Sequence, residues 1–232
     1  MTATPIGSVQ SLVRLLQLAS PTLPVGAYSY SQGLESAVAH GWVVDARTAA
    51  SWISDLLRFV VAPGEAAALW RLLAAVDRGD WAAAEDWNDW VRASRETCEL
   101  RAETEQMGAA LAKLVAELDL LDPAARAGAA TMFPVTLPAA YGLAARAFGI
   151  TREPAATAYL WSWLENQVLA AMKTIPLGQV AGQRLMLELG AAIPEALAVA
   201  RSIPDDEMST FAPGLALASS RHEKQYTRLF RS

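Results

Sequence analysis

The sequence is poor in the side chains on which most metal and catalytic sites depend. Its 232 residues include one cysteine, Cys98, and two histidines, His40 and His222. A single cysteine excludes an intrachain disulfide and suits a reducing compartment. Closely spaced Cys or His pairs of the kind that hold zinc are absent. The N-terminus also lacks the basic and then apolar order of a signal peptide. We therefore expect a cytoplasmic protein with no stably bound cofactor or metal.

The signatures of common enzymes are missing as well. The sequence contains no phosphate-binding G-x-x-x-x-G-K-S/T loop and no G-x-S-x-G turn of the hydrolases. Two histidines leave few candidate bases for a nucleophilic serine. His40 directly precedes Gly41, which favours a role as a donor or cation at the C-terminus of a helix. We expect the chain to bind no nucleotide.

Charge is scarce and slightly acidic. Hydrophobic residues make up 53% of the chain and charged residues 19%, with a formal net charge of −5. The acidic balance argues against nucleic acid as a partner, and the apolar content suggests surface that is buried against other proteins. Two uncharged runs, 15–34 and 127–145, approach the length of a membrane span. Each contains two prolines and many small residues, so we expect no membrane helix.

Hydrophobic periodicity predicts an all-α fold. Apolar residues recur with the 3.6-residue spacing of helices, and the alternation typical of strands is absent. The segment 153–173 is apolar on more than one face, which is typical of a central helix and favours a homodimer. We predict one domain over residues 1–232, a helical bundle of roughly ten helices. The predicted helices cover 9–20, 32–40, 45–63, 65–77, 80–94, 95–121, 139–148, 153–173, 179–189, 194–201 and 214–226.

Particular residues predict where several of these helices begin and end. Asp45 is a good N-cap, and Pro138 suits the first turn of a helix. Gly64 beside Pro63 should end one helix, and Asp122 followed by proline should end the long one.

A loop rich in aromatic and hydroxyl groups interrupts the helices at 21–35, with the sequence PTLPVGAYSYSQGLE. Pro21 and Pro24 forbid a helix across it. Such a loop is either a recognition surface or a connector whose tyrosines cover the core, and the residues alone leave both open. The candidate contact residues are Tyr28, Ser29, Tyr30, Ser31, Gln32, Gly33 and Glu35.

The last twelve residues, 221–232, combine cations with aromatic rings in the sequence RHEKQYTRLFRS. Arginine and aromatic residues are enriched at interface hot spots. Because the flanking residues are polar, we expect this tail to pack outside the core, to be mobile alone and to become ordered on binding a partner. The candidate contact residues are Arg221, His222, Glu223, Tyr226, Arg228 and Arg231.

Two other stretches are open to two interpretations. In 95–108, RETCELRAETEQMG, the residues Glu96, Glu99 and Glu103 share a helix face. That face is either solvated, with i, i+4 ion pairs, or part of a polar interface or lined passage. Lys173 ends the central helix, where it stabilises the helix dipole or contacts a partner beside a turn fixed by Pro176 and Gly178.

The loop, the tail, 95–108 and the stretch 173–179, KTIPLGQ, together resemble the UreF family of urease accessory proteins. The four blocks extend from the first helix to the last residue. One departure is Ala27, where the family often has a second glycine. The resemblance implies a non-catalytic adaptor in nickel insertion, without a metal of its own. It also implies a complex with UreD (UreH) that docks on the urease apoprotein and recruits the GTPase UreG, which carries Ni²⁺ for the di-nickel centre of urease.

The same resemblance assigns partner-binding roles to the loop and tail residues named above and to Lys173, Pro176 and Gly178. The apolar composition and the helix 153–173 add the expectation of a homodimer within the complex. The alternative is a helical enzyme with an unrecognised site in the 21–35 loop, which would use Tyr28 or Glu35. Turnover by the purified protein alone distinguishes the two.

Overall fold

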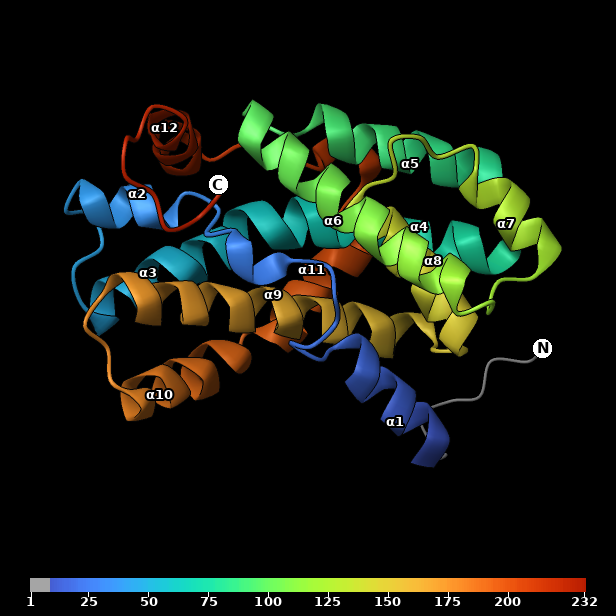
Figure 1. Cartoon of the computed structure of the whole chain (residues 1–232), viewed down its shortest axis with the longest axis horizontal. Helices are drawn as coiled ribbons and strands as arrows, with labels where there is room; N and C mark the ends of the chain where they lie inside the picture. Colours follow the sequence, from blue (N-terminus) through green and yellow to red (C-terminus); the bar gives the residue numbers. More distant parts are fainter. Residues whose placement is uncertain (1–8) are drawn as a thin grey trace.

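The structure is a computed structural model that describes residues 9–232, and every regular element in this range is helical (Figure 1). The predicted all-α class is confirmed. The elements are α1 (Val9–Leu18), η1 (Ala27–Ser29), α2 (Leu34–Ala39), α3 (Ala46–Leu56), η2 (Leu57–Glu65), α4 (Ala66–Arg78), α5 (Trp81–Ala93), α6 (Cys98–Glu117), α7 (Pro123–Ala129), α8 (Leu137–Phe148), α9 (Arg152–Thr174), α10 (Gln179–Gly190), α11 (Ile193–Ser202), η3 (Asp205–Glu207) and α12 (Pro213–His222).

The central helix predicted at 153–173 is α9, which runs along the middle of the molecule (Figure 1). Buried residues occur all around it, including Tyr159, Leu164 and Gln167. Helix α8 packs on α4 and α6, and Gly108 lets α6 approach the segment before α8. A Cβ on Gly108 would lie 2.3 Å from the backbone oxygen of Val135. This close contact places the middle of α6 against the core.

Three of the predicted helix ends are confirmed. The Asp45 carboxylate accepts a hydrogen bond from the backbone N–H of Thr48, and the Thr48 hydroxyl completes a capping box at the start of α3. Pro138 lies in the first turn of α8. His40 is the C-cap of α2, with its Nδ1 2.8 Å from the Ser36 oxygen, as its position before glycine predicted.

The helix end predicted at Pro63 and Gly64 is wrong. The chain stays helical from Ala46 to Arg78, because the turn around Pro63 widens into the π-helix η2. Gly64 serves close packing instead, since a Cβ there would lie 2.4 Å from Cγ2 of Thr210. This continuous helix is long and apolar enough to cross a membrane, but 72% of its most apolar window is buried inside the protein. That burial is the pattern of a core helix.

Three further boundaries differ from the prediction. Helix α6 begins at Cys98, after the N-cap Thr97, so Arg95 lies before the helix. Helix α6 ends at Glu117, before the predicted Leu121, and the Asp122 carboxylate instead caps α7, a helix that the sequence did not predict. The last helix ends at His222, four residues before the predicted Tyr226. The amides of Glu223, Lys224 and Gln225 still donate to the end of α12, and the backbone beyond them needs other partners.

Candidate partner-binding site

The loop, the tail, the start of α6 and the end of α9 meet at one end of the molecule. In Figure 1 the tail leaves α12, passes α2 and ends beside the loop. Phe230, which is 6% exposed, packs into a small apolar cluster with Leu34 of α2 and Ile175 after α9. Segments nearly two hundred residues apart thus share one packing unit, which we call the loop–tail junction.

Glu35 binds the tail to the first turn of α2. Its Oε1 accepts a hydrogen bond of 2.7 Å from the Leu229 N–H, and its Oε2 accepts one of 3.0 Å from the Phe230 N–H. Gly33, with a φ of 79°, precedes α2 and turns the chain so that Glu35 points inward. Glu35 is only 7% exposed, so these donors replace the water that an exposed carboxyl group would bind.

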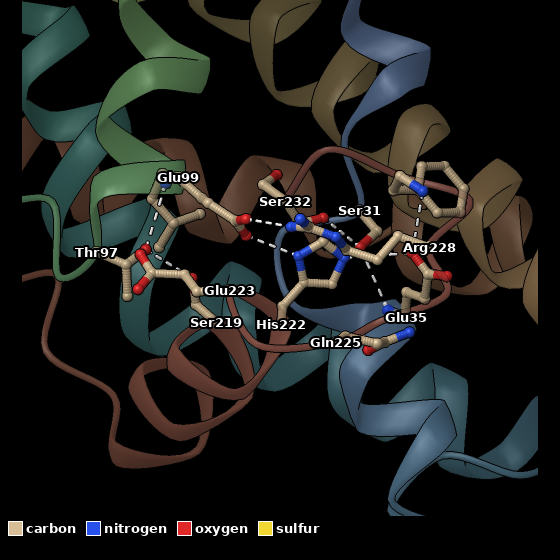
Figure 2. Close-up of polar contacts among 12 residues, drawn as sticks. Ser31, Glu35, Thr97, Glu99, Ser219, His222, Glu223, Gln225, Arg228 and Ser232 are labelled. Atoms are coloured by element: carbon tan, nitrogen blue, oxygen red, sulfur yellow. Dashed lines mark hydrogen bonds and ion pairs between the residues drawn. The ribbon is translucent and has the colours of Figure 1, made fainter.

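His222 lies between two carboxylates (Figure 2). Its Nδ1 is 2.7 Å from Oε2 of Glu99, and its Nε2 is 3.3 Å from Oε2 of Glu35. The imidazole is fully buried. The other oxygen of Glu99 accepts a hydrogen bond from Arg228. Helices α2, α6 and α12 and the tail are therefore joined through one imidazole.

Backbone hydrogen bonds align the tail with the loop. The Arg231 N–H donates to the Ser29 oxygen at 2.7 Å, and the Ser31 N–H donates to the Ser232 oxygen at 2.9 Å. The ammonium of Lys173 lies 5.4 Å from the ring of Phe230 and 5.9 Å from that of Tyr28. Lys173 thus contacts both the loop and the tail at the end of α9.

The prediction that the tail packs outside the core is contradicted by these contacts, whereas its mobility in the absence of a partner stays a prediction. His222, Phe230 and Ser232 are buried. Their polar neighbours concealed this in the sequence, because the buried side chains are scattered among exposed ones without a regular spacing. Tyr226 is fully exposed, and neither it nor Arg228 belongs to the last helix. The outward side chains are Arg221, Lys224, Tyr226, Thr227, Arg228, Leu229 and Arg231.

The acidic face of α6 is turned inward, so the interpretation as a solvated face is wrong for Glu99 and Glu103. Glu103 accepts hydrogen bonds from Nε2 of Gln32 at 2.7 Å and from the Ser232 hydroxyl at 2.6 Å. Burial raises the pKa of the Glu103 carboxyl to about 7. Glu96, outside the helix, is exposed.

The ion pairs expected within this stretch are replaced by longer-range ones. Arg95 pairs with Glu65 of η2, which also accepts a hydrogen bond from Tyr159. Glu105 pairs with Arg92 of α5. Spacing along one helix could not show these partners, because Arg95 precedes the helix and its partner lies 30 residues earlier.

A cavity of about 90 Å³ lies under the loop. Its polar lining includes Glu65, Arg95, Glu103 and Tyr159, and loop residues such as Tyr28 form another side. Burial raises the pKa of the Tyr28 hydroxyl above its ordinary value. Glu35, the other candidate of the enzyme alternative, is held by tail amides. Among residues 9–232, no cluster of three or more His, Cys, Asp or Glu side chains has a geometry that could hold a metal ion.

The remaining candidates lie at the edge of the junction. Pro176 and Gly178 form an exposed turn between α9 and α10. The Glu223 carboxylate accepts a hydrogen bond from the Cys98 N–H at 3.2 Å, and Arg221 lies over the ring of Trp42 at 5.2 Å. The sequence reading did not place Leu229, Phe230 or Ser232 at the site. The adjacent apolar residues Leu229 and Phe230 inside a polar tail are the sequence signal that could have identified two of these three residues.

The fold and the site define a helical protein whose most distinctive surface is an ordered loop and tail, as in a binding protein. A sequence model of the UreF family matches residues 43–190. The urease accessory protein UreF of Azoarcus sp. (strain BH72) is 53% identical over 234 residues, which cover all of both chains. The UreF of Janthinobacterium sp. (strain Marseille) is 51% identical over 96% of this chain and 99% of its own.

A third relative is the bifunctional urease accessory protein UreEF of Bordetella bronchiseptica. It is 50% identical over 99% of this chain, which spans 54% of that protein. This chain therefore belongs to the UreF family of urease accessory proteins, as the four sequence blocks predicted. The family is one of accessory proteins, not catalytic enzymes, and the alternative of a helical enzyme is not supported. The loop and the tail lie outside the matched range 43–190 but inside the full-length similarity to the Azoarcus protein.

Proposed function

We propose that this protein is a cytoplasmic adaptor in nickel insertion into urease, and that the loop–tail junction is a partner-binding surface. The observation that carries the proposal is the convergence of the four family-like blocks on one surface. Glu35, His222 and Lys173 each join at least two of these blocks. A surface assembled from distant segments presents a fixed set of contacts, which lowers the ordering cost of binding.

The proposed partners are UreD (UreH), the GTPase UreG and the urease apoprotein. The chain has no nucleotide-binding loop, so GTP hydrolysis has to occur on another subunit. The UreEF relative supports a role beside other accessory proteins, because its name joins two such functions in one chain. In this proposal Ni²⁺ is cargo passed within the complex and not a resident metal. Nucleic acid and membrane are not among the proposed partners.

A homodimer within the complex is part of the proposal. Helix α1 exposes Val9, Val13 and Leu16, and α10 exposes Val180 and Leu187. Such apolar faces are costly in water. Light scattering of the protein alone at tens of micromolar should show self-association, and a clean monomer would contradict this part of the proposal.

A pull-down with UreD, UreG and the urease apoprotein, each added separately, tests the adaptor function. The sharpest variant is Tyr226→Ala, because this ring is fully exposed and its loss should not disturb folding. We expect capture of at least one partner to weaken about thirtyfold, the loss typical of ~2 kcal/mol at a hot spot. Phe59→Ala, which removes an exposed ring on η2, is the matched control and should keep full capture.

Unchanged capture of all three partners by the Tyr226 variant would show that this ring does not contact any of them. Capture of none of them by the unaltered protein would overturn the adaptor proposal itself.

A further inference from the structure

The hydrogen bonds around His222 require one more proton than a neutral imidazole carries. Both ring nitrogens face carboxylate oxygens, at 2.7 Å for Glu99 and 3.3 Å for Glu35. A neutral imidazole has one N–H and one lone pair, so it can donate to only one of them. A ring lone pair directed at a second carboxylate oxygen would be repelled, because the imidazole is fully buried and the side chain of Glu99 is only 16% exposed.

The two carboxylates are both committed as acceptors. Glu35 accepts from the Leu229 and Phe230 amides, and Glu99 accepts from the Arg228 guanidinium. Neither carboxylate can donate a hydrogen bond to the ring unless it is itself protonated. The charged groups that face this cluster come from every element packed on it. They are Glu35 of α2, Glu99 of α6, and Arg228 of the tail, with Glu223 of the adjoining turn held by Cys98.

We propose that residues 222–232 form a proton-dependent latch over the loop, closed when the His222 cluster holds its extra proton and loosened when that proton leaves. Loss of the proton removes one charge-assisted hydrogen bond and leaves the buried Glu35 and the half-buried Glu99 beside a neutral ring. Both carboxylates regain water if the tail detaches. The latch therefore opens as the pH rises.

A second buried acid acts in the same direction at the far end of the tail. Ser232 covers Glu103, whose pKa is raised to about 7 by burial. Glu65 adds to this rise, whereas Arg95 and the donors Gln32 and Ser232 oppose it. Ionisation of Glu103 is easier in water than under the tail, so it favours the open state. Lys173 of α9 also faces the tail, with its ammonium 5.4 Å from the ring of Phe230.

An open latch would uncover Ser31, Glu35 and Glu103 and free the aromatic loop. Any effect of this opening on partner capture rests on the proposed adaptor function. The latch itself does not, so its test needs no partner.

Amide hydrogen exchange of the intact protein measures the latch directly. The Leu229, Phe230 and Arg231 amides are held by Glu35 and by the Ser29 oxygen. After correction for intrinsic exchange, their protection factors should fall roughly tenfold or more between pH 6 and pH 8.5, as expected for a lost charge-assisted hydrogen bond. Amides in the middle of α9 serve as the internal reference and should not change. Constant protection of the tail would overturn the proposal.

The variant Glu99→Gln tests the proton count. Its amide group can donate to a neutral ring, so a neutral imidazole can bridge Glu35 and residue 99. We expect the pH dependence of the three amides to become much smaller. Glu96→Gln, at an exposed position three residues earlier, is the matched control and should keep it. Retention of the full dependence in the Glu99 variant would refute the role of His222.

Nitrogen NMR tests the proton count without altering the His222 cluster. At pH 6 the His222 ring should show both nitrogens protonated, and a spectrum of His40→Gln, a change outside the cluster, assigns the signals of the two histidines. A single N–H on His222 at pH 6, with the tail amides still protected, would overturn the proposal.

Discussion

Removal of the Phe230 ring should open the tail without unfolding the protein. Phe230 is 6% exposed and fills a cluster formed by α2, α3, α9 and the turn after α9. Burying such a ring contributes roughly 1.5–3 kcal/mol, and truncation to alanine in a core costs about 3–5 kcal/mol once the cavity is included. The tail can leave its groove instead of keeping a cavity, so the cost should stay near the lower end, at ~3 kcal/mol. This corresponds to roughly a hundredfold more open tail.

Limited trypsin digestion reports the open fraction, because Lys224 and Arg228 lie within the tail. Phe230→Ala should speed cleavage there by about a hundredfold, while the melting temperature of the helical body falls by only a few degrees. Leu229→Ala is the matched control, because this neighbour is 71% exposed and should change neither value. Equal cleavage rates in the two variants would refute the claim that Phe230 anchors the tail. A collapse of melting would show that the tail unfolds only together with the body.

Three other predictions concern the buried polar groups and one glycine. The pKa of Glu103 is raised from 4.5 to about 7 in the folded state, so the free energy of unfolding should fall by up to ~3 kcal/mol as the pH rises from 4.5 through 7. Urea unfolding at several pH values measures this dependence, and Glu103→Gln should flatten it. Glu65→Gln leaves a buried arginine without its counter-ion and should cost about 3–5 kcal/mol, whereas Glu153→Gln, in an exposed ion pair, should cost less than ~1 kcal/mol; equal losses would contradict the structure. Gly108→Ala should lower the melting temperature strongly, since its Cβ would lie 2.3 Å from the Val135 oxygen, and an unchanged value would show that the two segments can separate.

The sequence alone was enough for the fold class and the family. Helical periodicity is repeated in every segment, and caps such as Asp45 act through bonds to residues only three positions away. Local signals of this kind need no knowledge of the tertiary structure. The four blocks that resemble UreF could be recognised for the same reason, because each is a short run of residues.

The local rules failed where distant packing determines the structure. Proline and glycine at 63 and 64 normally end a helix, but here η2 widens and the glycine packs under Thr210, 146 residues later in the chain. Arg95 and Glu65 could not be paired from spacing, because a loop and two helices separate them.

The candidate site shows the same division most clearly. Its residue types and most of its members could be read from the loop and the tail. Their arrangement could not, because the inward direction of His222 and Phe230 depends on Glu35, Glu99 and an apolar cluster built from four other segments. A polar tail has no periodic pattern that marks which side chains are buried. Only the tertiary structure brings these carboxylates and the apolar cluster to the tail. The carboxylates require hydrogen-bond donors and the cluster requires an apolar side chain to cover it, and these two requirements determine how the tail packs.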